Sequence, residues 1–170
     1  MNFIIFGEMG AGKSTVAKYL VDKFGYFNCA LGEKIHSECK LHGRGTREEM
    51  QEYGETMRKI FGENIWSDYL YNRYGDRKNI VIEDGREINE FHYFSTKGFL
   101  PIAIITSDDI RLERLQNRVD YIINPETFNH VTEVQVRECV NMCSIKIYNN
   151  LDNEELYKEI KNKLSSYLNC

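Results

Sequence analysis

The sequence predicts an α/β protein whose mostly parallel sheet is covered by helices on both faces. Short apolar runs, suited to buried strands, alternate along the chain with longer segments that have apolar residues at helical spacing. A glycine-rich turn also stands between the first such run and the first helix. The length of 170 residues suits one compact domain with a sizeable core.

The chain is predicted to begin with a strand and a helix. Residues 2–6 form a short apolar run, and residues 13–24 carry an apolar face followed by Gly25, a typical helix C-cap. Residues 26–31 give a weaker strand signal. Strand, glycine-rich turn and helix in this order are how an α/β fold starts.

The next block, residues 43–78, is predicted to be helical. Thr46 and Glu49 form a capping box that starts one helix, and Gly62 ends it. The apolar face of that helix is Met50, Tyr53, Met57, Ile60 and Phe61. A second helix starts near Asn64; its Trp66 and tyrosines could stack on a base, although such a stripe more often belongs to the core.

The second half continues the alternation. Strands are expected at residues 80–82, 100–105 and 145–148. Helices are expected from about residue 86 to 98, at 108–118 and 132–143, and from about 153, where Leu156, Ile160 and Leu164 form one stripe. Residues 120–130 are predicted to be a loop. Because ligands of parallel sheets sit at the carboxyl ends of the strands, the residues that follow each strand should converge on one cleft.

Residues 7–15 match the phosphate-binding pattern G-x-x-x-x-G-K-[ST]. Glycines let consecutive N–H groups point at phosphates, the following helix adds its positive end, Lys13 reaches the β- and γ-phosphates, and Ser14 offers a hydroxyl to Mg²⁺. ATP and Mg²⁺ are the ligands that this pattern predicts. The residues assigned to the phosphates are Gly7, Gly10, Ala11, Gly12, Lys13, Ser14 and Thr15.

Asp84 follows the apolar run at residues 80–82, where a second magnesium-side carboxylate belongs, and it can orient the metal or its water. Alternatively, Asp84 caps the helix that begins near Arg86. Gly85 stands where many ATPases have a water-activating glutamate. This difference favours transfer to an acceptor over hydrolysis.

Three arginines, Arg111, Arg114 and Arg118, share one face of a predicted helix and could stabilise the charge of a phosphoryl group in transfer. A solvated basic face paired with Glu113 is the alternative, most of all for Arg111. The neighbouring apolar face is Leu112, Leu115 and Val119. Three more arginines are candidates for an acceptor phosphate, with surface charge as the alternative: Arg47, Arg58 and Arg86.

The composition narrows the classes of partner. A net charge of −4 gives no broad basic surface for duplex nucleic acid, so an anionic ligand must be held by local positive charge. The longest apolar runs are too short to cross a bilayer. Five cysteines, an odd number without paired spacing, favour reduced thiols and a cytoplasmic location.

Taken in order along the chain, these segments resemble the P-loop nucleoside-monophosphate kinases, and most closely the phage-type deoxynucleoside monophosphate kinases. The resemblance rests on the segments at residues 7–15, 46–54, 64–66 and 82–86, the spaced arginines at 111–118, and Tyr148-Asn149-Asn150 before a final helix. The resemblance implies a five-stranded parallel sheet of the P-loop NTPase fold, a helical acceptor-binding insert at about residues 32–78 and a lid at about 111–133.

The resemblance also implies roles for single residues. Arg47 and Arg86 would meet the monophosphate, Arg114 and Arg118 would belong to the lid, and Asn149 with Asn150 would lie near the ATP base. Together with the motifs, this makes Lys13, Asp84, Arg114 and Arg118 the expected catalytic residues, and a nucleoside monophosphate the expected acceptor. The base, the sugar and the oligomeric state stay open.

Two other functions remain open from the sequence. Dephospho-CoA kinase is similar in fold and in the strand–Asn–helix ending, although the helix that begins near Arg47 fits it less well. A nucleotide-binding regulatory ATPase is the alternative of a different class, and the missing glutamate after Asp84 counts against it. The acidic balance disfavours a nucleic-acid-binding module.

Overall fold

The computed structural model describes residues 1–43, 45–117 and 131–168, and for residue 47 and residues 131–133 it describes the backbone alone. One sheet contains the strands β1 (Asn2–Phe6), β2 (Phe27–Cys29), β3 (Ile80–Gly85), β4 (Phe99–Ile105) and β5 (Ile145–Tyr148). The helices in these ranges are α1 (Lys13–Phe24), α2 (Gly32–Leu41), α3 (Arg47–Phe61), α4 (Ile65–Tyr74), α5 (Ile88–Thr96), α6 (Asp108–Gln116), α7 (Val131–Met142) and α8 (Asn153–Leu164).

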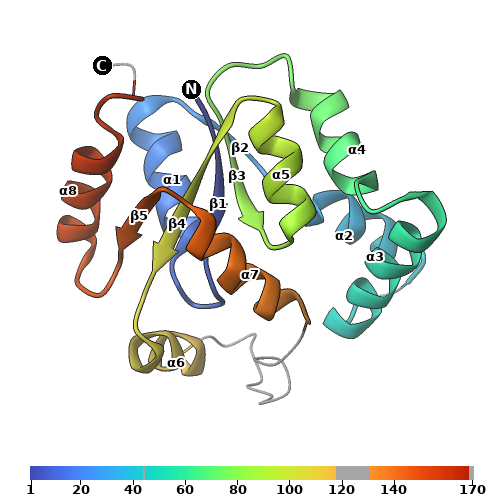
Figure 1. The fold of residues 1–170 in the computed structure, drawn as a ribbon. Helices are drawn as coiled ribbons and strands as arrows, with labels where there is room; N and C mark the ends of the chain where they lie inside the picture. Colours follow the sequence, from blue (N-terminus) through green and yellow to red (C-terminus); the bar gives the residue numbers. More distant parts are fainter. Residues whose placement is uncertain (44, 118–130, 169–170) are drawn as a thin grey trace.

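The sheet has the strand order β2-β3-β1-β4-β5, and every neighbouring pair is parallel. The central strand β1 sets Phe3 opposite Val81 on one side and Leu100 on the other. All carboxyl ends therefore point the same way, toward the bottom of Figure 1. The predicted α/β class with a five-stranded parallel sheet is confirmed.

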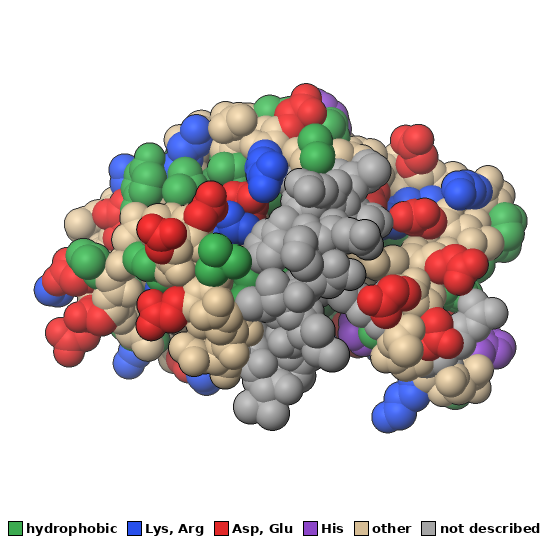
Figure 2. Space-filling model, turned by 90° about the horizontal axis from the view of Figure 1, so that it is seen from below, with side chains coloured by type: hydrophobic (Ala, Val, Ile, Leu, Met, Phe, Trp, Pro, Cys, Tyr) green, Lys and Arg blue, Asp and Glu red, His purple; other side chains and the backbone are tan. Residues whose placement is uncertain are grey.

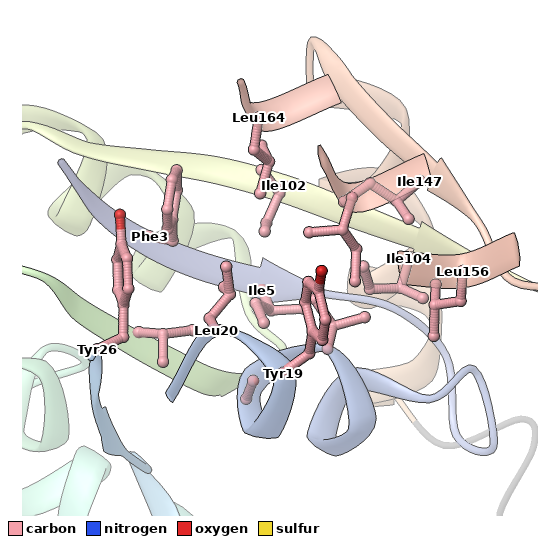
Figure 3. Close-up of a cluster of buried hydrophobic side chains, with 14 of the residues drawn as sticks. Phe3, Ile5, Tyr19, Leu20, Tyr26, Ile102, Ile104, Ile147, Leu156 and Leu164 are labelled. Atoms are coloured by element: carbon pink, nitrogen blue, oxygen red, sulfur yellow. The ribbon is translucent and has the colours of Figure 1, made fainter. Parts of the chain in front are cut away.

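Helices cover both faces of the sheet, with α1 and α8 on one and α5 and α7 on the other (Figure 1). Figure 3 shows the apolar layer under α1 and α8, where aromatic and branched side chains from both helices meet those of the strands. The predicted stripe of α8 is buried here: Leu156, Ile160 and Leu164 are at most 1% exposed. Burial of such apolar area is what holds the helices on the sheet.

Helices α2, α3 and α4 form the predicted helical insert and lie beside the α5 side of the molecule (Figure 1). Trp66 of α4 is 4% exposed and donates its indole N–H to the Gly54 carbonyl of α3 at 3.3 Å. Trp66 therefore belongs to the core between the insert and the sheet, as the alternative to base stacking predicted.

The structure corrects the apolar face of α3 at its C-terminal end. Ile60 and Phe61 are 64% and 61% exposed, so the apolar contact of this helix ends one turn earlier, at Met57. Helix α6 ends at Gln116. The predicted loop at residues 120–130 and the helix end at Arg118 lie outside the described residues. Among those residues, every helix is too short or too polar to cross a bilayer.

Candidate functional site

The loop between β1 and α1 folds into a phosphate-binding turn. Gly10 and Gly12 have φ angles of 80° and 96°, a left-handed backbone that glycine adopts without strain. Lys13, at the end of the turn, is hydrogen-bonded to its beginning. The ammonium donates to the Gly7 carbonyl at 2.6 Å and to the Glu8 carbonyl at 3.3 Å. The local sequence dictates this shape, since glycines stand at both left-handed positions.

Two buried side chains, which follow the neighbouring strands β4 and β5, hydrogen-bond to the loop. Thr106, which follows β4, donates its hydroxyl to the Ala11 carbonyl at 3.0 Å, and Asn149, which follows β5, donates its amide to the same carbonyl at 2.8 Å. The two side chains belong to residues that are 6% and 4% exposed. The phosphate-binding turn is thus tied to the ends of β4 and β5 as well as to its own helix.

A pocket of about 480 Å³ opens at the carboxyl ends of the strands, beside this loop. Its lining residues are Met9, Gly10, Gly12, Lys13, Ser14, Thr15, Ala30, Glu83, Asp84, Arg86 and Arg114. Figure 2 views this side of the molecule, and acidic and basic side chains are mixed over its described part. Positive charge for an anion is therefore local to the pocket, as the net charge of the chain predicts.

Asp84 lies where β3 meets the pocket, next to an irregularity in the sheet. Ile4 pairs with Ile82 and Phe6 with Gly85, so β3 has one more residue than β1 over this stretch. Such a bulge redirects side chains at the end of a strand. The Asp84 carboxylate accepts a hydrogen bond from the backbone N–H of Leu31 at 2.7 Å and another from that of Gly32 at 2.9 Å.

Asp84 therefore caps the first turn of α2, whereas the predicted alternative was a cap on the helix after Arg86. That helix, α5, has Glu87 as its N-cap. Each Asp84 oxygen keeps a lone pair beyond the N–H that it accepts. The carboxylate is thus fixed in place and can still receive a ligand from the pocket.

Helix α6 presents two arginines to the loop. Arg114 donates to the Gly10 carbonyl at 3.5 Å and to the Asn149 carbonyl at 3.2 Å, and it lines the pocket. Arg111 is 3% exposed and donates to the Met9 carbonyl at 2.9 Å. The alternative of a solvated basic face is therefore wrong for Arg111. Of the predicted apolar face, Leu115 is fully buried, whereas Leu112 is 37% exposed.

Arg58 of α3 is not among the residues that line the pocket, and it lies in a buried ion cluster. Its guanidinium is 3.0 Å from a Glu87 oxygen and 3.6 Å from a Glu90 oxygen. The other Glu90 oxygen accepts the backbone N–H groups of Arg86 and Glu87 at 2.8 and 3.0 Å. Burial raises the pKa of the Glu90 carboxyl to about 7, and the neighbouring Glu87 charge adds to the rise. The cluster ties the insert to the turn that carries Arg86.

The remaining predicted residues lie as follows. Asn150 accepts the Ser107 N–H at 2.8 Å and so holds the start of α6 to the end of β5. Arg47 starts α3, with its side chain not described, and Arg118 lies outside the described residues. Gly7 and Ala11 contribute carbonyls to the loop, as given above.

The sequence reasoning did not single out several residues that the structure brings to this site. Met9, Ala30 and Glu83 line the pocket, and Thr106 supports the loop. Thr106 directly follows β4, so its position at a strand end was a usable signal. Glu83 precedes Asp84 at the end of β3, where the register with β1 is irregular, and nothing in the sequence signals that irregularity.

The chain is similar in sequence and in fold to several known proteins. The profile of the AAA domain family matches residues 4–128. A protein of Acanthamoeba polyphaga mimivirus, provisionally named a deoxynucleotide monophosphate kinase, is 26% identical over 185 aligned positions, which cover 92% of each chain. A UPF0200 protein of Staphylothermus marinus is 30% identical over 118 residues, covering 68% of this chain and 62% of that protein.

Among solved structures, the shikimate kinase of Aquifex aeolicus superposes with a TM-score of 0.66 at 19% sequence identity. The superposition covers 98% of this chain and 97% of that one. At this identity the similarity concerns the fold: a five-stranded parallel sheet with flanking helices.

Proposed function

The chain belongs to the AAA domain family and has the fold of the P-loop kinases, and we propose that it transfers the terminal phosphoryl group of ATP to a nucleoside or deoxynucleoside monophosphate. The observation that carries this proposal is the composition of one pocket. Lys13, Arg114 and Arg86 come from three separate segments, and all line it together with Asp84. The similarity to the mimivirus protein over 92% of the chain supports the choice of acceptor.

The proposed catalysis consists of positioning and of charge stabilisation. Backbone N–H groups of the loop and the Lys13 ammonium bind the phosphates of ATP, while Arg114 is the group that meets the charge of the phosphoryl group in transfer. Arg118 is proposed to assist from the lid. No covalent intermediate is needed, and no general base, because a monophosphate acceptor is already anionic.

The acceptor side is proposed to lie between the insert and the turn after β3. Arg86 lines the pocket and its backbone N–H is held by the buried Glu90. Arg47 is proposed to reach the acceptor phosphate from the start of α3. Arg58 is better explained as the residue that holds the insert to this turn, since two carboxylates already surround it. Asn149 and Asn150 support the ATP side.

Mg²⁺ fits the residues that line this pocket. Ser14 offers a hydroxyl and Asp84 a carboxylate, which are the oxygen ligands that this cation prefers. Because both Asp84 oxygens already accept backbone N–H groups, we expect this carboxylate to act through a water of the ion. When bound, Mg²⁺ would neutralise negative charge on the phosphate oxygens.

A coupled assay of ADP release tests the proposal. Each common nucleoside and deoxynucleoside monophosphate is offered with Mg-ATP, and dephospho-CoA is offered in parallel. We expect turnover with one or a few of the monophosphates. Turnover of dephospho-CoA alone would establish the rival kinase, and ADP release that needs no acceptor would establish a regulatory ATPase.

A kinase for a hydroxyl acceptor is the second candidate, and one observation favours it. Two carboxylates, Glu83 and Asp84, line the pocket, and a hydroxyl acceptor needs such a group to take its proton. The shikimate kinase shares the fold. Adding small hydroxylated metabolites to the same assay separates the candidates, because turnover of such a metabolite in the absence of any nucleoside monophosphate would establish a hydroxyl acceptor.

We also propose a cytoplasmic location. Four cysteines of the described chain are free thiols in the interior, as expected in a reducing compartment. They are Cys29, Cys39, Cys139 and Cys143. Trapping thiols in intact cells and mapping them by mass spectrometry tests this proposal.

A further inference from the structure

The phosphate-binding loop carries a carboxylate that does not line the pocket. Glu8 is the second residue of the motif, where a negative charge would repel phosphates if it pointed inward. Its side chain instead pairs with Arg111 of α6 at 3.0 Å and with Arg137 of α7 at 2.8 Å. The loop is therefore held to two helices that are distant from it in the sequence.

Of these two contacts, the one with Arg111 is the enclosed one. The Arg111 side chain is 4% exposed, and that of Glu8 is 22% exposed. Asp108 also pairs with Arg111, at 2.6 Å, but its side chain is 84% exposed. A buried charge is costly without a partner in the same environment, so Glu8 is the carboxylate that makes the buried position of Arg111 tolerable.

Arg111 in turn fixes how α6 sits on the loop. Its guanidinium donates to the Met9 carbonyl, next to Glu8 in the chain. Arg114 lies three residues further on the same helix and therefore on the same side. It reaches the Gly10 carbonyl and lines the pocket. A shift of α6 at Arg111 would move Arg114 relative to the phosphates.

We propose that Glu8 is a positioning residue that acts through Arg111 to hold Arg114 at the phosphates of bound ATP. This inference rests on the proposed phosphoryl transfer for the role of Arg114. It concerns the nucleotide side of the pocket alone, so it can be tested without an acceptor.

The test compares the affinities for Mg-ATP and Mg-ADP by calorimetry, because the two ligands differ only in the terminal phosphate. The preference for ATP is the Kd of Mg-ADP divided by the Kd of Mg-ATP. We expect Arg114→Ala to lower this ratio about tenfold, the scale of one charge-assisted contact. Glu8→Gln should narrow the preference by a similar factor in the wild-type background and cause no further change in the Arg114→Ala background. Glu8→Asp, which keeps the charge, should restore part of the preference.

Glu113→Gln is the matched control, since it removes an exposed carboxylate from α6 and should leave both affinities unchanged. An equal effect of Glu8→Gln in both backgrounds, or no effect in either, would overturn the proposal. If Arg114→Ala left the preference for ATP unchanged, Arg114 would not contact the terminal phosphate and the proposal would be overturned. The acceptor assay would still decide the enzyme class.

If Glu8→Gln does not fold, a second variant still tests the proposal. The double substitution Glu8→Gln with Arg111→Met removes the buried cation together with its partner, which is better tolerated than removing one of them. Circular dichroism checks that this variant is folded. We expect it to lack the ATP preference, and a folded double variant with the full preference would contradict the proposal.

Discussion

At the scale of single residues, Gly12 shows how closely the phosphate-binding loop is packed. Its φ angle of 96° favours glycine, and a Cβ placed on it would overlap the Asn149 amide nitrogen. We expect Gly12→Ala to lower the free energy of unfolding by about 2–3 kcal/mol, from backbone strain and displacement of Asn149. ATP affinity should fall at least tenfold. Urea unfolding and calorimetry measure the two effects.

Gly98 provides the control for this substitution. Its φ angle of 80° is also left-handed, but nothing lies within 4 Å of a Cβ added there. Gly98→Ala should lower the free energy of unfolding by about 1 kcal/mol and leave ATP binding intact. Equal losses of ATP affinity in the two variants would mean that the contact with Asn149 has no role.

Lys13 gives the most direct test of the proposed chemistry. Replacing it with alanine removes the ammonium that is proposed to meet the β- and γ-phosphates, so kcat should fall by about 10²–10⁴. Its ammonium donates to the Gly7 and Glu8 carbonyls of the loop, and we expect the melting temperature to change by a few degrees. Lys18→Ala, on the exposed side of the same helix, should keep wild-type kcat. A Lys13→Ala enzyme with an unchanged rate would remove Lys13 from the mechanism.

How well a residue was predicted depends on how local its contacts are. The phosphate-binding motif was recognised because its glycines, lysine and hydroxyl are encoded in nine consecutive residues. For Arg111 the alternative of a solvated face stayed open, because its burial depends on Glu8 and Met9, about a hundred positions away in the chain. Helical spacing shows which residues share a face, but it does not show what that face contacts.

At the scale of the elements, the start of α3 is set by residues close in sequence, whereas the start of α2 is set by a distant one. The capping box of Thr46 and Glu49 was read from the sequence, and the structure confirms it as the start of α3. Helix α2 lacks a side-chain cap at Leu31, its own N-cap. Asp84, 53 residues beyond Leu31, caps it instead. The sequence therefore predicted a helical insert without resolving this helix.

The capping box of α5 contains a titratable group in the interior. Glu90 is 3% exposed, and burial raises the pKa of its carboxyl to about 7, above the usual value of 4.5. The folded state thus binds a proton more tightly than the unfolded state. The contribution of Glu90 to the free energy of unfolding is largest below about pH 4.5 and declines as the pH rises to about 7, in total by about 3 kcal/mol.

Glu90→Gln tests this pH dependence, because the amide keeps an oxygen for the N–H groups of Arg86 and Glu87 but does not titrate. Urea unfolding between pH 5 and pH 8 should show the free energy of the wild type falling relative to that of the variant. Parallel curves for the two proteins would show that Glu90 has an ordinary pKa.

At the scale of the whole molecule, the alternation of strands and helices was enough to predict the layers. It could not give the strand order β2-β3-β1-β4-β5, because each pairing joins segments distant in sequence. The position of the pocket followed from the carboxyl ends of the strands. The acceptor did not follow in this way, since the segments proposed to bind it, the insert and the turn after β3, are brought together by tertiary contacts such as those of Arg58.

Ligand binding should stabilise the whole domain, because the phosphate-binding loop contacts residues that follow both β4 and β5. At about 100 times its Kd, Mg-ATP should raise the free energy of unfolding by about 2.7 kcal/mol and the melting temperature by about 5–10 °C. Differential scanning calorimetry measures the shift. Adenosine, which lacks phosphates, should give almost none, and an equal shift with adenosine would contradict phosphate binding by the loop.

The central place of β1 also determines when the protein can fold during its synthesis. This strand leaves the ribosome before its neighbours β3 and β4, which follow only after the insert has been translated. Until then the side chains of Phe3, Ile4, Ile5 and Phe6 have no sheet to enter, although all four are fully buried in the finished protein. Until β4 has emerged, these four side chains therefore remain an exposed apolar segment that favours aggregation of the nascent chain.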